Sequence, residues 1–586
     1  MRQWMVAAKK ADFYAIAEKF HVDPVVARII RNREVIGEKN IRIYLGGNLS
    51  DLSDPHQMKD MDRLVEILAQ KIRKQVHIRI IGDYDVDGVT SSHLFLTALR
   101  RVGAKVDVVI PHRIQDGYGL SLHLLQQAKE DGVDTILTCD NGIAAIDEIA
   151  WAKAQKMTVL VTDHHAVPFE EHEGRRTEKK SLADAVVNPH QQDCGYPYKE
   201  LCGAGVAWNV IRVLYENYDM DKREAEDLLD FVAMATVCDV MSLTGENRIL
   251  VKEGLKRIRH TKNIGLQALM QACNVQPENI SAYHFGYVLG PCVNATGRLD
   301  TARHALRLFE TGQETEAEEI ARDLVDLNQE RKELTLQGVE MAKKLCEEGG
   351  YENDPVLVLF LPDVHESIAG LIAGRIREMY NRPVFVLTRG EEGVKGSGRS
   401  TENYSMYENM CGCAELFTKF GGHPMAAGLS LPEENVEKFR RKINENCPLT
   451  VEEVCSDIHI DMAMPVGYAS TELVHQFALL EPFGKDNPSP LFADRNLSIS
   501  RMWVIGKNRN VLRMSVLSEY GQPVPVIFFG DVETLFAYFT EKFGQKEVEN
   551  ALHGRKNRIL FSMVYTAKID FYQGNENLQL EMKYYR

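Results

Sequence analysis

Three aspartates at alternate positions are the clearest chemical signal in the sequence. Asp83, Asp85 and Asp87 occur in GDYDVDG, directly after the apolar run VHIRII. Alternate residues of an extended chain face the same side, so the three carboxylates are expected to converge. A divalent cation would offset their repulsion, and carboxylate oxygens suit Mg²⁺ or Mn²⁺. The alternatives are a plain acidic loop and a calcium loop of EF-hand type, which would need glutamate where Leu94 stands.

Three further motifs add candidate metal ligands. Asp140 occurs in TCDNG, Asp163, His164 and His165 in VTDHH, and Asp239 in TVCDV at the end of an apolar helical run. An imidazole can ligate a metal while a neighbouring carboxylate orients its ring. Alone, DNG is a turn signal and Asp239 an ordinary helix-terminal acid. Together, the motifs predict one acidic and histidine-containing site.

The elements that must position these residues are strands of a parallel sheet. Short β-branched runs alternate with helical patterns from about Val76 to Val187, as expected for parallel strands with crossover helices. Asp83, Asp140 and Asp163 each come at or just after the end of such a run. Open parallel sheets place their active sites along that edge.

The rest of the chain predicts further domains. Helical patterns dominate residues 201–344, including a long polar stretch of the kind that bridges domains. The strands PVLVLF and PVFVL then flank a helix in a second α/β unit, and strand patterns after about Cys455 indicate a small barrel. The fold class is therefore α/β with a β-rich C-terminal part.

Composition narrows the class of protein. A chain of 586 residues exceeds what one hydrophobic core supports, and no apolar run is long enough to span a bilayer. The eleven cysteines lack CxxC spacing, which fits reduced thiols in a cytoplasmic protein; zinc at Cys411 and Cys413 is a weak alternative. The net charge of −15 argues against a protein that coats nucleic acid nonspecifically, but permits a local basic groove.

Four polar clusters have the composition of phosphate-binding segments. Glycines let backbone N–H groups approach an anion, arginine pairs with phosphate oxygens, and tyrosine can stack a base. Each cluster alone reads as a surface turn. The clusters are PHRIQDGYGL with Arg113 and Tyr118, NATGR with Asn294 and Arg298, GSGRS with Ser397 and Arg399 on an expected glycine-rich loop, and GGHPMAAG with His423.

The combination DxDxDG, DNG, DHH and a later aspartate resembles the DHH phosphoesterase superfamily. The resemblance implies that two divalent cations, Mn²⁺ or Mg²⁺, are held by Asp83, Asp85, Asp87, Asp140, His164 and Asp239. Asp140 would be the bridging ligand, and His165 would contact the scissile phosphate. Asp140, His164 and His165 are thus the expected catalytic residues in phosphodiester hydrolysis by two metals.

Longer segments resemble the RecJ family of single-stranded-DNA-specific exonucleases over nearly the whole chain. They include GPCVNATGRLDTA, VKGSGRS, GGHPMAAGLS and LEPFGKDNPSPLF. The resemblance implies 5′-to-3′ release of 5′-mononucleotides in DNA repair and recombination, by a monomer whose candidate partners are a helicase and a single-strand-binding protein. It also implies an N-terminal segment (1–60) packed on a DHH catalytic domain (61–310), a connecting helix (311–345), a DHH-associated α/β domain (346–450) and an OB-fold β-barrel (455–586).

The same resemblance assigns the substrate-binding residues. Arg113, Ser397 and Arg399 would form a pocket for the 5′-terminal phosphate, which would set the polarity. The remaining expected contacts are Asn294 and Arg298 to phosphate near the scissile bond, Tyr118 to a base, and His423 along the cleft. Two departures concern the DNA channel: Cys292 replaces an arginine of the family pattern, and VHESIAG replaces a WHPGVIG-like segment.

Two other functions remain open at this point. A phosphodiesterase of the same superfamily acting on short RNA or cyclic dinucleotides would ordinarily lack the strand-rich C-terminal part. A replication scaffold that binds DNA without cutting it would be marked by lost metal ligands, and here every expected position is filled. An inorganic pyrophosphatase would not explain the expected barrel.

Overall fold

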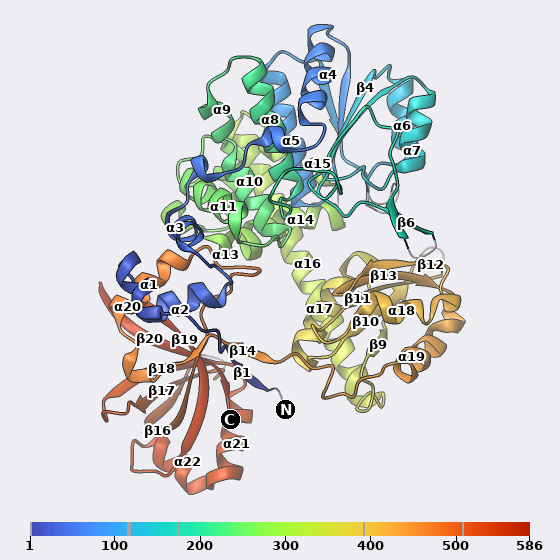
Figure 1. Cartoon of the computed structure of the whole chain (residues 1–586). Coiled ribbons are helices and arrows are strands. Elements are labelled where there is room, and N and C mark those ends of the chain that lie inside the picture. The colour runs from blue at the N-terminus through green and yellow to red at the C-terminus, as the bar shows by residue number, and fades with distance from the viewer. Residues whose placement is uncertain are drawn as a thin grey trace. The chain divides into compact units, whose positions relative to one another are not determined.

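A computed structural model of the chain describes residues 3–113, 116, 119–172, 175–299, 301–390, 393–506, 509–572 and 574–586. The chain divides into two compact units, whose elements are labelled in Figure 1. The first unit comprises residues 48–456, and the second combines residues 3–47 with residues 457–586. Among the described helices, none is both long and apolar enough to cross a membrane.

A five-stranded parallel sheet, in the order β3-β2-β4-β5-β8, organises the first unit. Its strands are β2 (Ile78–Ile81), β3 (Val106–Val109), β4 (Thr135–Cys139), β5 (Thr158–Thr162) and β8 (Ala185–Val187). Successive side chains enter different cores, since Ile80 and Leu137 pack in one apolar cluster and Ile81 and Ile136 in another. The sequence prediction of a buried parallel sheet is confirmed.

Helices cover both faces of this sheet. One face packs against α4 (Met61–Arg73), α5 (Val86–Arg101) and α8 (Gly203–Asn217), and the other against α6 (Leu122–Glu130) and α7 (Ile146–Ala154). Because four residues separate the end of β2 from the start of α5, Asp83 and Asp85 of GDYDVDG lie in the strand-to-helix turn, and Asp87 lies in the first turn of α5. Asp85 is the N-cap of α5, and its carboxylate accepts a hydrogen bond from the Gly88 N–H at 3.0 Å.

A helical layer follows the sheet in the chain. It contains α10 (Leu229–Cys238), α11 (Gly245–Ile258), α12 (Ile264–Ala272), α14 (Gly290–Leu299) and α15 (Ala302–Glu310). NATGR lies within α14, so this cluster is helical and not a turn. The 35-residue helix α16 (Glu314–Glu348) then extends about 50 Å at 1.5 Å per residue, where the sequence predicts a connecting helix.

A mixed five-stranded sheet, in the order β12-β13-β11-β10-β9, forms the second α/β part of the first unit. Its strands are β9 (Leu357–Phe360), β10 (Val384–Arg389), β11 (Val394–Arg399), β12 (Lys419–His423) and β13 (Ala426–Leu431). Helix α17 (Ala369–Tyr380) connects the parallel strands β9 and β10. The expectation that GSGRS is a loop is wrong, because these residues form β11 between two hydrogen-bonded neighbours.

The second unit contains the expected β-rich structure. Its main strands are β16 (Phe492–Ile505), β17 (Val511–Leu517), β18 (Pro523–Phe529), β19 (Leu560–Tyr572) and β20 (Asn575–Tyr585). They pair in the order β16-β17-β18-β20-β19, and β19 pairs with β16 again. This return to the first strand is the pairing of a small barrel. The helices α21 (Val532–Phe543) and α22 (Gln545–Leu552) within it are not anticipated from sequence.

The N-terminal residues share the core of the second unit. Helices α1 (Phe13–Phe20), α2 (Pro24–Asn32) and α3 (Glu38–Gly46) contribute buried side chains to the cluster that the barrel strands form. Arg33 adds a buried ion pair with Asp461 at 2.7 Å. From sequence, residues 1–60 are expected against the catalytic domain; residues 48–60 lie in the unit that contains it, where Met58 joins the core, whereas residues 3–47 belong to the second unit. Apolar helical periodicity shows that a helix has a buried face, but it does not say which core receives that face.

Candidate metal centre and phosphate pocket

The candidate metal ligands follow three neighbouring strands. Asp83, Asp140 and His164 come within two residues of the ends of β2, β4 and β5, which lie side by side in the sheet. Asp239, the C-cap of α10, joins them from the helical layer. Chain order alone would leave these groups far apart, and the sheet brings them to one edge.

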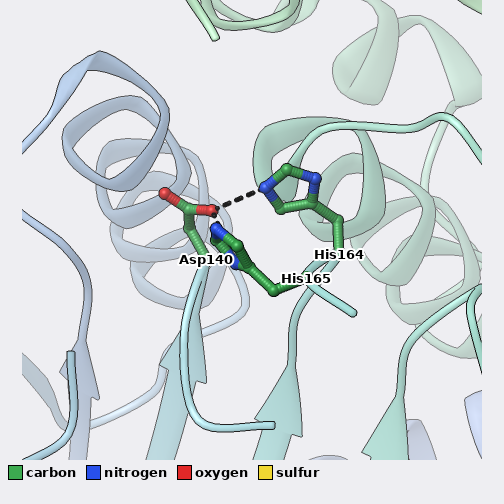
Figure 2. Close-up of side chains that lie close together, drawn as sticks. All are labelled: Asp140, His164 and His165. Carbon is green, nitrogen blue, oxygen red and sulfur yellow. Dashed lines mark ion pairs between the residues drawn. The ribbon is translucent and has the colours of Figure 1, made fainter. Parts of the chain in front are cut away.

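His164 lies at the centre of this cluster. Its Nε2 is 3.1 Å from Asp140 Oδ1, 3.5 Å from Asp239 Oδ2 and 3.7 Å from Asp87 Oδ2 (Figure 2 shows the first contact). Three overlapping groups have ligand atoms within 4.8 Å of one another, and Asp140 belongs to two of them. The groups are Asp140, His164 and His165; Asp87, His164 and Asp239; and Asp83, Asp85 and Asp140.

The electrostatics of the cluster favour bound cations. Burial, followed by repulsion from neighbouring carboxylates, raises the pKa of Asp140 and Asp83 well above 3.8. Burial lowers the pKa of His164, and its Nε2 makes no hydrogen bond within the described part of the chain. An imidazole nitrogen and several carboxylate oxygens thus face one another at close range. Divalent cations fit this donor set, and the oxygen-rich composition suits Mg²⁺ or Mn²⁺.

The backbone at Asp140 is held in an uncommon conformation. Asp140 has φ 61°, in the left-handed region that non-glycine residues seldom adopt. The Asn141 side-chain amide supports the turn, donating to the carbonyl of Ile81 at 3.1 Å and to that of Cys139 at 3.0 Å. Such strain persists only where the surroundings enforce it, and here it aims the Asp140 carboxylate at His164.

Asp163 orients the two histidines and is not a ligand in any of the three groups. Its Oδ1 accepts hydrogen bonds from the backbone N–H of His164 at 2.7 Å and from His165 Nδ1 at 2.8 Å. Its Oδ2 accepts from the backbone N–H of Ile143 at 2.9 Å. Although burial lowers the pKa of His165, the Asp163 contact and the other carboxylates outweigh it and raise that pKa to about 9. A protonated His165 can donate to a phosphate oxygen.

Asp87 is fixed by the start of a helix. Its carboxylate accepts the backbone N–H groups of Gly203 at 2.6 Å and Ala204 at 2.8 Å, the first two residues of α8. The helix dipole favours a negative charge at this end. This contact could not be predicted from the sequence, since α8 lies more than a hundred residues downstream and GAGVAW carries no charged side chain.

A cationic cavity of about 520 Å³ lies in the same unit. Its described lining includes five cationic side chains and the first residues of α17, Ala369 and Gly370, whose N–H groups favour anions. Glu366 is the acidic side chain of that lining and pairs with Lys395 at 2.8 Å. The cationic residues are Arg113, Arg298, Lys395, Arg399 and Lys419.

The arginines of the cavity are buried close to one another. Burial and then repulsion from Arg113 lower the pKa of Arg298 to about 10. Burial and neighbouring guanidinium groups also lower the pKa of Arg399, whose Nη1 is 3.3 Å from Ser397 Oγ. Arg298 donates to the Ser367 carbonyl at 2.5 Å. An anion bound here would relieve the repulsion among these cations, as expected for a phosphate pocket.

The structure therefore brings together Arg113, Arg298, Ser397 and Arg399 of the predicted substrate-binding set. Asn294 lies apart from that lining, and its Oδ1 accepts the backbone N–H of Val86 at 3.2 Å.

Two further predicted contacts lie elsewhere. His423 has an exposed side chain at the end of β12 and is not in the described lining of the cavity. Tyr118 lies outside the described residues.

Tyr84 is a residue of the cavity that sequence reasoning missed. It lines the cavity, and the Arg113 guanidinium lies 4.9 Å from the centre of its ring. Its flanking residues Asp83 and Asp85 belong to a metal-ligand group. The alternation expected from sequence for Asp83 and Asp85 also predicts that Tyr84 faces away from them.

Three protein-family models match successive parts of the chain. The model of the DHH family, N-terminal domain, matches residues 77–236, the DHHA1 domain residues 353–447, and the RecJ OB domain residues 460–584. These matches agree with the catalytic sheet, the second α/β part and the barrel. The expected fold class is confirmed.

Whole-length relatives extend the agreement. The single-stranded-DNA-specific exonuclease RecJ of Haemophilus influenzae is 32% identical, with 96% of each chain covered. The protein of the same name from Bacillus subtilis is 32% identical over 87% of this chain and 63% of its own length. The crystal structure of RecJ from Thermus thermophilus with Mn²⁺ matches with a TM-score of 0.81 at 25% identity, covering 100% of this chain and 79% of that one. The chain belongs to the RecJ family.

Proposed function

We propose that this chain is a single-stranded-DNA-specific exonuclease that hydrolyses phosphodiester bonds from the 5′ end, releases 5′-mononucleotides and acts in DNA repair and recombination. The observation that carries the proposal is the continuity of two sites through Tyr84. This residue lines the cationic cavity, and its two neighbours are candidate metal ligands. A terminal phosphate bound in the cavity would thus place a nearby phosphodiester at the metal centre.

The residues around the metal centre have separable roles in this proposal. When bound, two divalent cations would supply an activated water and neutralise charge on the phosphoryl group. Asp140 and His164 each belong to two ligand groups, and Asp140 is the better candidate for a shared ligand because a carboxylate has two oxygens to offer. His165, held by Asp163 at 2.8 Å, would donate to a phosphate oxygen. Asn294 would act by fixing the start of α5, where its side chain accepts the Val86 N–H.

The cavity supports the proposed polarity. A terminal phosphate monoester carries more negative charge than an internal phosphodiester, so a pocket of clustered guanidinium groups favours a chain end. Arg298 and Arg399 are both partly buried, which strengthens their interaction with an anion. The cavity therefore favours 5′-phosphorylated substrates over those with a 5′-hydroxyl group.

End-labelled oligonucleotides test the function directly. The full-length protein is incubated with single-stranded DNA labelled at either end, with Mn²⁺, Mg²⁺ or chelator, beside duplex DNA, short RNA and a cyclic dinucleotide. The expected result is metal-dependent release of mononucleotides from the 5′ end of single-stranded DNA. Preference for RNA or the cyclic dinucleotide would assign the chain to another activity, and tight DNA binding without cleavage would indicate a scaffold.

A matched pair of variants tests the pocket. Arg399→Gln removes a cation of the cavity, whereas Arg389→Gln removes an exposed arginine that pairs with Glu433. We expect Arg399→Gln to abolish the preference for a 5′-phosphate and Arg389→Gln to retain it. An equal loss of the 5′-phosphate preference in both variants would show a nonspecific charge effect and contradict the pocket assignment.

The cellular setting belongs to the same proposal. We infer a cytoplasmic monomer that works beside a helicase and a single-strand-binding protein, the setting that the family resemblance suggests. Sedimentation of the purified chain, alone and with single-stranded DNA coated by such a binding protein, tests the oligomeric state and the partner together.

A further inference from the structure

Two cysteine sulfurs lie in contact next to the substrate-binding machinery. Cys273, the C-cap of α12, and Cys292, near the start of α14, have their Sγ atoms 3.8 Å apart. All eleven cysteines are in the described part of the chain. Within that part, Cys273 and Cys292 are the pair whose sulfurs contact each other. Cys139 and Cys202, by contrast, contact the hydroxyl groups of serine and threonine.

The two thiols differ in exposure and in charge environment. Cys292 is 2% exposed, whereas Cys273 is partly exposed. The Asn328 side-chain amide of α16 donates to Cys292 Sγ at 3.3 Å, and Lys332 lies nearby. The hydrogen bond with Cys273, the Asn328 bond and this positive charge lower the pKa of Cys292, while the pKa of Cys273 is raised. The negative charge of the pair is thus stabilised on the buried sulfur.

We propose that Cys273 and Cys292 form a reversible disulfide, driven by a low-molecular-weight disulfide, that slows DNA cleavage. The more exposed Cys273 thiol passes its proton to the adjacent Cys292 sulfur and attacks the small disulfide. This forms a mixed disulfide and releases one small thiolate, which takes up that proton from Cys292. The Cys292 thiolate then attacks the Cys273 sulfur and expels the second. In total, two protein thiols are oxidised, one small disulfide is reduced to two thiols, and their protons pass to these products.

The effect on cleavage follows from the position of Cys292. A disulfide requires the sulfurs to approach to about 2.05 Å, so a contact of 3.8 Å must shorten by about 1.7 Å. Cys292 shares α14 with Asn294 and Arg298, and Asn294 fixes the start of α5 through the Val86 N–H. A shift of α14 by this amount would move Arg298 in the cavity. Through Asn294 it would also move the start of α5, next to the metal-ligand segment. Misplacement by about 1 Å can slow catalysis up to about 100-fold.

Oxidised glutathione serves as the probe, applied to the full-length protein with dithiothreitol as the reverse treatment. We expect a peptide linked through Cys273 and Cys292 by mass spectrometry, and cleavage of single-stranded DNA slowed at least about ten-fold and restored by dithiothreitol. Cys273→Ser should cleave at the wild-type reduced rate and resist oxidation. Cys411→Ser, which removes an exposed thiol, should remain sensitive.

The possible failures are distinguishable. A stable glutathione adduct at Cys273, or no linked peptide in the oxidised wild-type protein, would refute the disulfide. A linked peptide with unchanged cleavage would refute its effect on activity, as would equal inhibition of Cys273→Ser. This second part rests on the proposed function. Absence of nuclease activity in the reduced wild-type protein would refute that function, while the linked peptide would still report the disulfide.

Discussion

Replacing Asp140 by asparagine should stabilise the metal-free protein while abolishing its response to Mn²⁺. Asp140 belongs to two of the three ligand groups, and its pKa is raised first by burial and then by neighbouring carboxylates. Asparagine preserves the shape of the side chain and removes the charge. The substitution thus separates two effects of the Asp140 charge: the destabilisation of the protein when the site holds no metal, and the stabilisation of the metal ions when it does.

Two estimates limit the gain in the free energy of unfolding that follows from removing the Asp140 charge. The ligand atoms of Asp83, Asp85 and Asp140 lie within 4.8 Å of one another, and unit charges at that distance repel by about 3.5 kcal/mol at an effective dielectric constant near 20. Two such neighbours would cost about 7 kcal/mol. Protonation limits the cost, because neutralising a carboxyl group of ordinary pKa 3.8 at pH 7 requires about 4 kcal/mol. We therefore expect the free energy of unfolding of metal-free Asp140→Asn to exceed that of the wild-type protein by at most about 4 kcal/mol.

Denaturant unfolding with and without Mn²⁺, followed in parallel with DNA cleavage, provides the assay. At a hundred-fold excess over the dissociation constant, Mn²⁺ should stabilise the wild-type protein by about 2.7 kcal/mol per site and leave Asp140→Asn nearly unchanged. Cleavage should fall by about 10³-fold or more. Asp239→Asn, which alters one ligand group, should retain part of the Mn²⁺ response. Full turnover and full Mn²⁺ stabilisation in Asp140→Asn would refute its role as the shared ligand.

Three further changes have defined outcomes. Glu366→Gln removes the partner of Lys395 in the cavity and should tighten binding of 5′-phosphorylated DNA about two- to five-fold, measured by anisotropy. Gly370→Ala would place a methyl group 3.0 Å from Arg399 Nη2 and should therefore weaken the preference for a 5′-phosphate in cleavage. A preserved preference would contradict the pocket geometry. Burial lowers the pKa of His93 to about 3, against 6.5 unfolded, so the unfolded chain takes up a proton first as the pH falls. Stability at pH 5.0 should then be about 2 kcal/mol below that at pH 7.5 from this group, a difference that denaturant melts of His93→Gln should lack.

Much of the metal centre could be predicted from sequence because its ligands follow strands. The apolar runs before Asp83, Asp140 and His164 are short and β-branched, and the segments between them have helical periodicity. Parallel strands joined by crossover helices must bring their carboxyl ends to one edge, so chain position alone indicates proximity. Asp239 could be placed only through the family resemblance, since a helix-terminal aspartate has no such geometric constraint.

The phosphate pocket was harder to predict because its local sequences suggest loops. The glycines of GSGRS favour turns in isolation, yet β11 is a central strand of its sheet. A Cβ atom at Gly398 would lie 2.3 Å from the sulfur of Met406, so tertiary packing requires glycine at this strand position. The N-terminal helices were placed on the wrong partner for a related reason, because amphipathic periodicity does not identify the core that a helix joins.

In the proposed function, the strand-to-helix turn after β2 would link recognition of the chain end to the chemistry. Asp83 and Asp85 belong to a metal-ligand group, while Tyr84 lines the cationic cavity with the Arg113 guanidinium 4.9 Å from its ring centre. Because Tyr84 stands between Asp83 and Asp85 in the chain, neither site can shift far without moving the other. A terminal phosphate in the cavity is then held at a fixed spacing from the metal centre. Fixed spacing of this kind explains why an exonuclease of this design would remove nucleotides from an end and leave internal bonds intact.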